Sequence, residues 1–439
     1  MKRKNQSWIY FALFLCFSLM GLVVFGIGRS SGANPGIAGN RWLILMYDDA
    51  DFLGYDPMVD FAAEAFSHEN LDILVLQDNF YSPAIIWQIG PNHELIPRKY
   101  LGEIDMSSPA SLEYFLKFAY NRFPDRRTIL CFYDHGAGWW GACLDETNQK
   151  NKAESLSLSM LTPAEMRNAL EKTKPVDLIC FTAPCVMGSI EAAYELSQNY
   201  EAWLGSENFS GYIYWFGCIR YMCDTVKNRP DLSARELALE ILNFTATNFR
   251  GYNAFDKNYT MAAVRSDRLA EAVEAIHGLS ASLLANRDEA FSLMDKALAE
   301  TLNFGNTFVD VIDLFEKMMT KCQNPSLKES LHTAADAVRQ TLIAEAHGRD
   351  MSGPNGLNIY LPLPLMEPLD PAYGNLDLAF TRDTGWSEVL SAYRNSRPNA
   401  VLPGGRFRIS RAGGFYPPPD DSRRRRSDIN KREADNEVR

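Results

Sequence analysis

Short apolar runs alternate with amphipathic patterns along the first half of the chain. Mostly apolar runs bounded by polar or turn-forming residues are typical of strands buried on both faces. In this chain such runs cover residues 42–47, 73–76, 128–133, 177–181 and 203–204. Helical spacing separates them over residues 57–65, 109–123, 163–173 and 188–198. Buried strands that alternate with helices form parallel βαβ units. The pattern therefore predicts an α/β fold around a mostly parallel sheet.

Local signals refine this pattern at several points. Ser107-Ser108-Pro109 is typical of a helix start, because a Ser hydroxyl caps the helix and Pro is favoured in its first turn. Residues 84–96 predict a hairpin. Residues 230–350 are mostly helical in pattern, with one strand expected at 259–264, and a final strand is expected at 356–361. We therefore expect a helical addition after the α/β core.

The N-terminal segment predicts export. Lys2, Arg3 and Lys4 precede residues 8–28, which contain no charged side chain. A spanning helix needs about 20 apolar residues, whereas the apolar part of a cleavable signal has about 7–15. The basic end is expected to stay in the cytoplasm. Residues 1–33 are thus either a signal-anchor or a cleaved signal, for which residues 31–33 supply the small side chains of a cleavage site. A signal-anchor would leave the protein in the membrane with its main domain outside the cytoplasm, whereas a cleaved signal would make it a secreted protein.

Residues 34–40 are interpreted as a linker, residues 41–396 as the main domain and residues 397–439 as a charged tail. The linker is rich in Gly, Asn and Pro, and the tail combines Gly, Pro and charge, including the run Arg423 to Arg426. Such a composition cannot bury enough apolar surface to fold alone. The tail is therefore expected to be disordered.

Composition and charge exclude several classes of function. The chain has 439 residues, 46% of them hydrophobic, and a net charge of −11. This charge argues against a nucleic-acid binder, because such proteins neutralise phosphates with Lys and Arg. No HExxH, GxSxG, P-loop or paired CxxC motif supports a zinc hydrolase, a serine hydrolase or a nucleotide-binding enzyme. We expect no cofactor, and a calcium requirement is left open.

Seven cysteines remain when Cys16 of the N-terminal segment is set aside. An odd number in an exported protein allows disulfide pairs plus one free thiol. Cys131 and Cys180 lie inside apolar runs and are expected to be buried small hydrophobic residues.

Two predicted strands end in reactive side chains. The strand at 128–133 leads into Asp134-His135-Gly136, and the strand at 177–181 leads to Cys185, with a helix shortly after it. The carboxyl ends of parallel strands meet at one edge of a sheet, where ligands bind. A thiol attacks a carbonyl when a base takes its proton and N–H groups stabilise the oxyanion.

His135 can act as that base, the following glycine lets backbone N–H groups approach a substrate, and the helix N-terminus after Cys185 would favour thiolate. The alternative is a packing cysteine beside an ordinary His-Gly pair, since His277 and His347 also precede glycine. Those two end helical patterns, and only His135 follows a buried strand. The sequence thus predicts a Cys–His nucleophilic site.

These two regions resemble the clostripain family of cysteine peptidases. Residues 132–139, Phe-Tyr-Asp-His-Gly-Ala-Gly-Trp, are similar to its histidine motif, and residues 185–196 are similar to its nucleophile motif. Supporting similarities at 47–53, 205–207 and 356–362 extend the resemblance over residues 41–393.

The resemblance implies a caspase-like three-layer α/β sandwich with additional helices. It also implies that Cys185 is the nucleophile and that His135 is the general base and then the acid. The backbone N–H groups of Gly136 and Cys185 would form the oxyanion hole.

The substrate pocket departs from the family pattern. Clostripain relatives usually have an Asp two residues before the nucleophile, which helps to hold a basic P1 side chain, and this chain has Ala183 there. Glu207 either supplies the missing charge or is a surface carboxylate or helix cap. Trp139 either lines the substrate cleft or covers the sheet edge. The P1 preference is therefore open.

The resulting hypothesis is an exported cysteine endopeptidase that acts on protein or peptide substrates and contacts the membrane through its N-terminal helix. The alternatives are a degenerate relative that binds peptides without cleaving them and a surface scaffold. Asp48, Asp49 and Asp51 form either a cation site or a set of strand-end carboxylates that cap the next helix. Residues 148–152 are either an activation-cleavage loop or a solvated loop.

Overall fold

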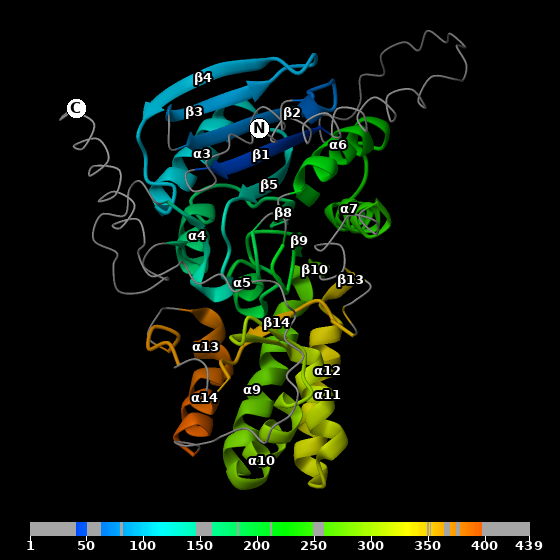
Figure 1. The fold of residues 1–439 in the computed structure, drawn as a ribbon. Coiled ribbons are helices and arrows are strands. Elements are labelled where there is room, and N and C mark those ends of the chain that lie inside the picture. The colour runs from blue at the N-terminus through cyan, green and yellow to red at the C-terminus, as the bar shows by residue number, and fades with distance from the viewer. Residues whose placement is uncertain are drawn as a thin grey trace, which may run out of the picture. The chain divides into compact units, whose positions relative to one another are not determined.

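A large β-sheet forms the centre of the unit that extends from Gly39 onward (Figure 1). The computed structural model describes residues 41–50, 63–79, 82–145, 160–181, 184–210, 213–248, 259–348, 351, 353–363, 369–374 and 378–396. Within these residues the sheet has nine strands in the order β13-β10-β9-β8-β5-β1-β2-β3-β4. Their bounds are β1 Trp42–Asp49, β2 Leu71–Asn79, β3 Ser82–Ile89, β4 Leu95–Gly102, β5 Arg127–Tyr133, β8 Leu178–Cys180, β9 Ala202–Gly205, β10 Thr260–Arg265 and β13 Leu342–His347.

The middle of the sheet is parallel and both edges are antiparallel. Strands β9, β8, β5, β1 and β2 run in the same direction. At one edge β3 and β4 form the predicted hairpin, and at the other β10 pairs antiparallel with β9 and β13. This arrangement confirms the predicted mostly parallel sheet and sets the carboxyl ends of β1, β5 and β8 along one edge.

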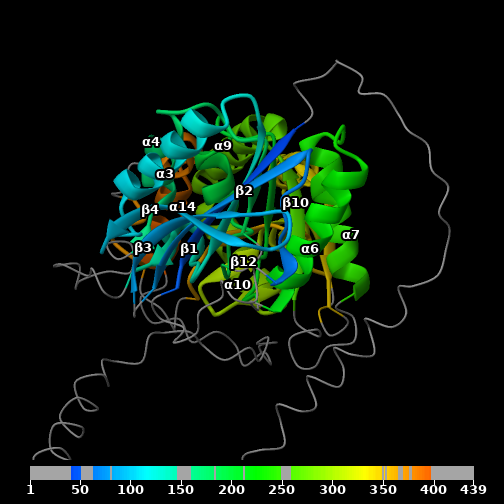
Figure 2. The same ribbon diagram turned by 90° about the horizontal axis from the view of Figure 1, so that it is seen from above.

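Helices cover both faces of the sheet, because alternate side chains of a buried strand point to opposite faces. Leu43 and Leu45 of β1 join a core with residues of α3, α4 and α5, whereas Ile44 and Met46 join a second core with residues of α6 and α7. Figure 2 shows α3 and α4 on one side of the strands and α6 and α7 on the other. These helices are α3 Pro109–Arg122, α4 Pro163–Leu170, α5 Ile190–Glu195, α6 Ile213–Asn228 and α7 Ala234–Asn248. The result is the three-layer α/β architecture.

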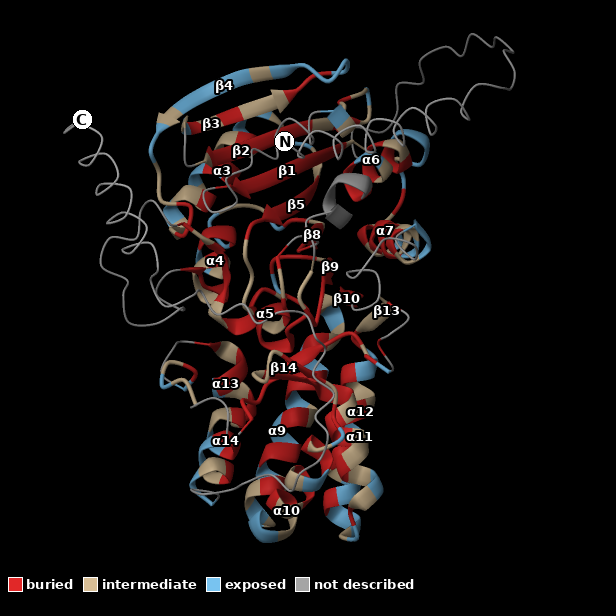
Figure 3. Ribbon diagram, in the orientation of Figure 1, coloured by how far each residue is buried: buried red, intermediate tan, exposed pale blue. Residues whose placement is uncertain are grey.

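Burial decreases from the middle of the sheet to its edge (Figure 3). Every residue of β1 is buried, whereas β4 is mostly exposed. Pro97, Arg98 and Lys99 lie in β4, and a proline together with charged side chains disfavours the pairing of a further strand. The core of the molecule therefore sits around β1, β5 and β8, next to the two reactive loops.

The structure contains the predicted helical addition, whose helices lie before and after β13, the last strand of the sheet along the chain. Its helices are α9 Leu269–Ala285, α10 Arg287–Leu298, α11 Val311–Lys321, α12 Pro325–Arg339, α13 Ala379–Thr384 and α14 Trp386–Asn395. The final predicted strand belongs here and not to the main sheet: β14 Asn358–Tyr360 pairs antiparallel with β12 Phe308–Asp310, which pairs with β11 Asn303–Phe304. This small sheet was not predicted, because its strands are too short to show an alternating pattern.

Two short strands and two 3-10 turns complete the described elements. They are β6 Ala142–Leu144, β7 Met160–Leu161, η1 Gly138–Trp140 and η3 Ser266–Arg268. The predicted start of α3 is confirmed, since the Ser108 hydroxyl accepts a hydrogen bond from the Ala110 N–H at 3.3 Å. None of the helices in the described ranges combines the length and apolar character needed to cross a membrane. The segment at 1–33, the linker and the tail lie outside the described residues.

Candidate active site

The two predicted reactive loops lie against each other. Strands β5 and β8 are parallel neighbours, with Cys131 opposite Cys180, so the loops that follow them leave the same edge of the sheet. A Cβ atom added to Gly136 would lie 2.4 Å from the carbonyl oxygen of Cys185 and 2.7 Å from Cβ of Pro184. Only a glycine permits this approach, which brings the His-Gly loop into contact with the backbone of the candidate nucleophile.

Strained backbone flanks both candidate catalytic residues. Asp134, immediately before His135, has φ of 144°, and Val186, immediately after Cys185, has φ of 59°. Positive φ is a genuine outlier for a β-branched residue, and such strain persists only where the surroundings hold it in place. Here the Asp134 carboxylate accepts a hydrogen bond from the Leu144 N–H at 2.6 Å, and the Val186 N–H donates to the Asn208 carbonyl at 3.0 Å.

The loop after β9 covers the candidate nucleophile. The Sγ atom of Cys185 accepts from the Ser210 N–H at 3.3 Å and donates to the Ser210 carbonyl at 3.5 Å. The Ser210 hydroxyl also donates to the Pro184 carbonyl at 3.0 Å. A substrate that binds at Sγ therefore meets a thiol that is already hydrogen-bonded to the backbone of Ser210.

Cys185 is distinguished from the other cysteines by its exposure. All seven cysteines of the described residues are free thiols, so the disulfide pairs allowed by their odd number are not formed among them. Six are buried, as predicted for Cys131 and Cys180, and only Cys185 is partly exposed. Among these thiols, Cys185 is the one positioned to react with a ligand.

Both members of the candidate pair are neutral in this arrangement. Burial raises the pKa of Cys185, an effect that the Ser210 hydrogen bonds reduce and the Asp134 charge reinforces. Burial lowers the pKa of His135. The predicted stabilisation of a thiolate by the following helix is therefore corrected: α5 begins only at Ile190, and the hydroxyl of its N-cap residue, Ser189, accepts from its third N–H.

The Gly136 N–H lies beside the Cys185 backbone and donates no backbone hydrogen bond within the described residues. Gly136 forms an isolated antiparallel bridge with Ala142. The two hydrogen bonds of this bridge run from the Ala137 N–H to the Gly141 carbonyl and from the Cys143 N–H to the His135 carbonyl. The Gly136 N–H is not used in that bridge. It lies on the strand-end loop that touches Cys185, the position expected for an oxyanion donor.

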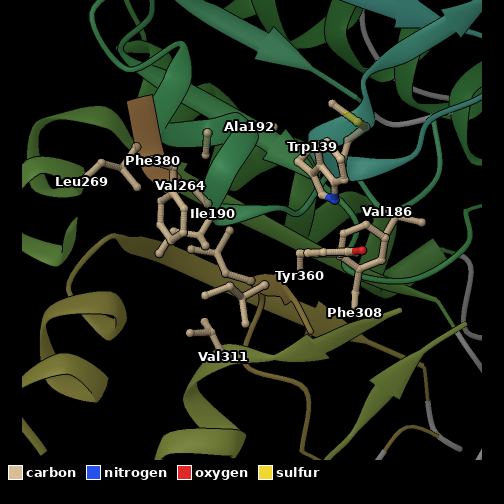
Figure 4. Packing of buried hydrophobic residues seen from close by; sticks show 14 of the residues in the cluster. Trp139, Val186, Ile190, Ala192, Val264, Leu269, Phe308, Val311, Tyr360 and Phe380 are labelled. Carbon is tan, nitrogen blue, oxygen red and sulfur yellow. The ribbon is translucent and has the colours of Figure 1, made fainter. Parts of the chain in front are cut away.

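Trp139 lies in the hydrophobic core, which corrects the expectation that it lines the substrate cleft. It has no exposed surface, and its ring stacks on Trp140 at 4.6 Å and meets the rings of Tyr360 and Tyr373 edge-on. Figure 4 shows Trp139 among buried side chains, with Tyr360 nearby. Packing against the helical addition, which the local sequence does not reveal, removes Trp139 from the surface.

Glu207 is also fully buried, and this placement corrects both sequence-based interpretations of it. Its carboxyl group lies near Asp310 and the Gly356 N–H, and burial followed by the Asp310 charge raises its pKa. The pKa of Asp310 is raised to about 7, mainly by burial. Glu207 has no surface available to a P1 side chain, and Ala183 lies outside the described residues.

Asp48 and Asp49 are strand-end carboxylates, as one of the two interpretations has it: they are the last residues of β1 and are fully buried. Asp48 accepts from the Gln77 side chain at 3.3 Å. No group of three or more His, Cys, Asp or Glu side chains within the described ranges is arranged to hold a metal ion. Asp51 and residues 148–152 lie outside those ranges.

Sequence reasoning missed two residues that contact the site. Ser210 contacts the thiol through its backbone, and a backbone contact cannot be predicted from the type of side chain. Asn358 is fully buried in β14 and donates to the carbonyls of Val186 and Glu207. A polar Asn inside an otherwise apolar predicted strand was the available signal for Asn358.

The model of the clostripain family matches residues 59–393. The chain belongs to the clostripain family. This match confirms the resemblance that the histidine and nucleophile motifs indicated. A comparison with curated proteins found no match.

Two solved structures of clostripain-type proteases share the fold. A secreted C11 cysteine protease from Bacteroides thetaiotaomicron, in complex with an irreversible peptide inhibitor, is 14% identical with a TM-score of 0.58, covering 79% of this chain and 99% of that one. An inactive zymogen C11 protease from Parabacteroides distasonis is 16% identical with a TM-score of 0.59, covering 80% and 99%. At these identities the likeness confirms the α/β fold with its large central sheet flanked by helices.

Proposed function

We propose that this clostripain-family chain is a cysteine peptidase that hydrolyses peptide bonds with Cys185 and His135. The observation that carries the proposal is the contact between Gly136 and the Cys185 backbone. It joins the loop that bears the imidazole to the turn that bears Cys185, a partly exposed residue. Family membership supports the same chemistry.

The raised pKa of Cys185 and the lowered pKa of His135 favour a neutral pair that reacts by general-base catalysis. As Sγ attacks the substrate carbonyl, His135 takes the thiol proton. The N–H groups of Gly136 and Cys185 donate to the oxyanion. His135 then gives the proton to the leaving amine, and water hydrolyses the thioester and regenerates the thiol.

The substrates are proteins or peptides, in keeping with the family. Glu207 is buried beside Asp310 and has no surface with which to pair with a basic P1 side chain. A strict preference for Arg or Lys would therefore need another acidic group. The apolar N-terminal segment supports action outside the cytoplasm, either anchored to the membrane or secreted.

A peptide-library assay tests the proposal. The full chain should cleave members of a fluorogenic peptide library, whereas Cys185→Ala and His135→Ala should show no turnover. Cys322→Ala, which removes a buried thiol at the end of α11, is the matched control and should keep full activity. Turnover by Cys185→Ala at the wild-type rate would refute the mechanism.

A peptide-binding protein without peptidase activity is the second candidate. The contacts of Ser210 with the Cys185 thiol favour it, because they cover the nucleophile. It predicts binding of library peptides without turnover. Cleavage of any library peptide by the wild-type chain, absent in Cys185→Ala, would exclude this candidate.

A further inference from the structure

Asn358 connects the helical addition to the candidate active site. It begins β14, pairs with Asp310 of β12, and its N–H donates to the Gly188 carbonyl at 2.7 Å. Its side chain is fully buried. A buried amide needs hydrogen-bond partners, so the partners of this side chain show which segments it connects.

Both donors of the Asn358 amide bind loops of the site. The side-chain nitrogen lies 3.3 Å from the Val186 carbonyl oxygen and 2.9 Å from the Glu207 carbonyl oxygen. Because both partners are carbonyl acceptors, the NH₂ group must face them, which settles the orientation of the amide. One partner follows the nucleophile directly, and the other lies in the loop that continues to Ser210.

We propose that Asn358 is a positioning residue for the nucleophile: its amide ties the turn that carries Cys185 to the loop that covers the thiol. Val186 has a strained φ of 59°. Such a conformation persists only where contacts with the surrounding structure hold the residue in it. The hydrogen bond to the Val186 carbonyl is such a contact. Because that carbonyl belongs to the residue after Cys185, the bond also holds the Cys185 peptide against Gly136.

The consequence has two parts, and the catalytic part depends on the proposed peptidase function. Without the amide, the nucleophile turn relaxes away from Gly136, and peptide turnover falls. The loop at Glu207 also loosens its hold on the thiol through Ser210, and Cys185 becomes more accessible. Turnover and thiol accessibility therefore change in opposite directions.

Asn358→Ala tests the proposal, with Asn303→Ala as the matched control. Asn303 is a buried Asn of β11 in the same small sheet, and it has no side-chain hydrogen bond to the nucleophile turn within the described residues. Alkylation of individual cysteines by iodoacetamide is followed by mass spectrometry of the native protein. In Asn358→Ala we expect alkylation of Cys185 to speed up about fivefold, as for the loss of one hydrogen bond. We also expect kcat to fall about 100-fold, with KM changed less than kcat.

Buried Cys131 and Cys180 report global unfolding in the same experiment, since both are fully buried beneath the helices. They should stay unmodified in Asn358→Ala, and Asn303→Ala should match the wild type at Cys185. Unchanged alkylation of Cys185, or parallel labelling of Cys131 and Cys180, would overturn the positioning role. If Asn358→Ala does not fold, Asn358→Leu, which keeps the branched heavy-atom skeleton of the side chain and removes its N–H donors, makes the same comparison. Absence of turnover in the wild type would refute the peptidase function and leave the alkylation result decisive for Asn358.

Discussion

Replacing Gly136 with Ala introduces one methyl group at the contact between the two reactive loops. The added Cβ would lie 2.4 Å from the Cys185 carbonyl oxygen, and real Cβ atoms essentially never approach closer than 3.0 Å. The loops must therefore separate by at least about 0.6 Å, and the obstacle is backbone, not the end of a flexible side chain. The displaced atoms include the Gly136 N–H and the peptide of the nucleophile.

The expected effect is larger on catalysis than on stability. A displacement of about 1 Å in a catalytic group costs about 100-fold in rate, and loss of an oxyanion donor costs about 10²–10³-fold. We therefore expect kcat for Gly136→Ala to fall by about tenfold if the loops are only displaced, and by up to about 1,000-fold if the Gly136 N–H no longer reaches the oxyanion. Overpacking of this kind costs about 1–3 kcal/mol of unfolding free energy, so most of the protein stays folded.

The assay combines kcat on a cleaved peptide with thermal unfolding of the same preparation. Gly278→Ala is the control, because Gly278 lies in α9 and an added Cβ meets no atom within 4 Å. That variant should keep wild-type kcat and gain about 0.5–1 kcal/mol, since Ala is the better helix former. Wild-type kcat in Gly136→Ala would refute the inference that the His-Gly loop is pressed against the nucleophile.

Two further predictions follow from buried titratable groups. Because burial lowers the pKa of His135 below 6.5, the acid limb of kcat/KM should titrate below pH 6.5, and a limb above that value would contradict a buried neutral base. Glu207→Gln should stabilise the protein increasingly as the pH rises above 4.5: the unfolded-state carboxyl ionises there, whereas the buried one, with its raised pKa, holds its proton. The wild type then loses up to about 1.4 kcal/mol for each unit of pH relative to the variant, and a Tm difference that does not grow between pH 4.5 and pH 7.5 would count against the raised pKa.

Local sequence patterns predicted the elements and the candidate dyad. Strand β1 and helix α3 were readable because consecutive apolar residues and a Ser-Pro helix start act over a few neighbouring positions. His135 and Cys185 could be identified because each lies in the loop after a buried strand, His135 after β5 and Cys185 after β8. The pattern indicated only that both carboxyl ends lie at one edge of the sheet; the pairing of β5 with β8, which places the two loops side by side, is a result of the sheet order.

The sequence by itself determined which residues form the buried strands, the helices and the reactive loops, because these depend on spacing along the chain. Tertiary structure decided that Trp139 and Glu207 are buried and that β14 belongs to the small sheet and not to the main one. It also decided that Ser210 and Asn358 contact the nucleophile turn. These features arise between distant segments: Asn358 and Val186 are 172 residues apart. Burial and hydrogen-bond partners depend on which surfaces the folded chain brings together, and no local pattern carries that information.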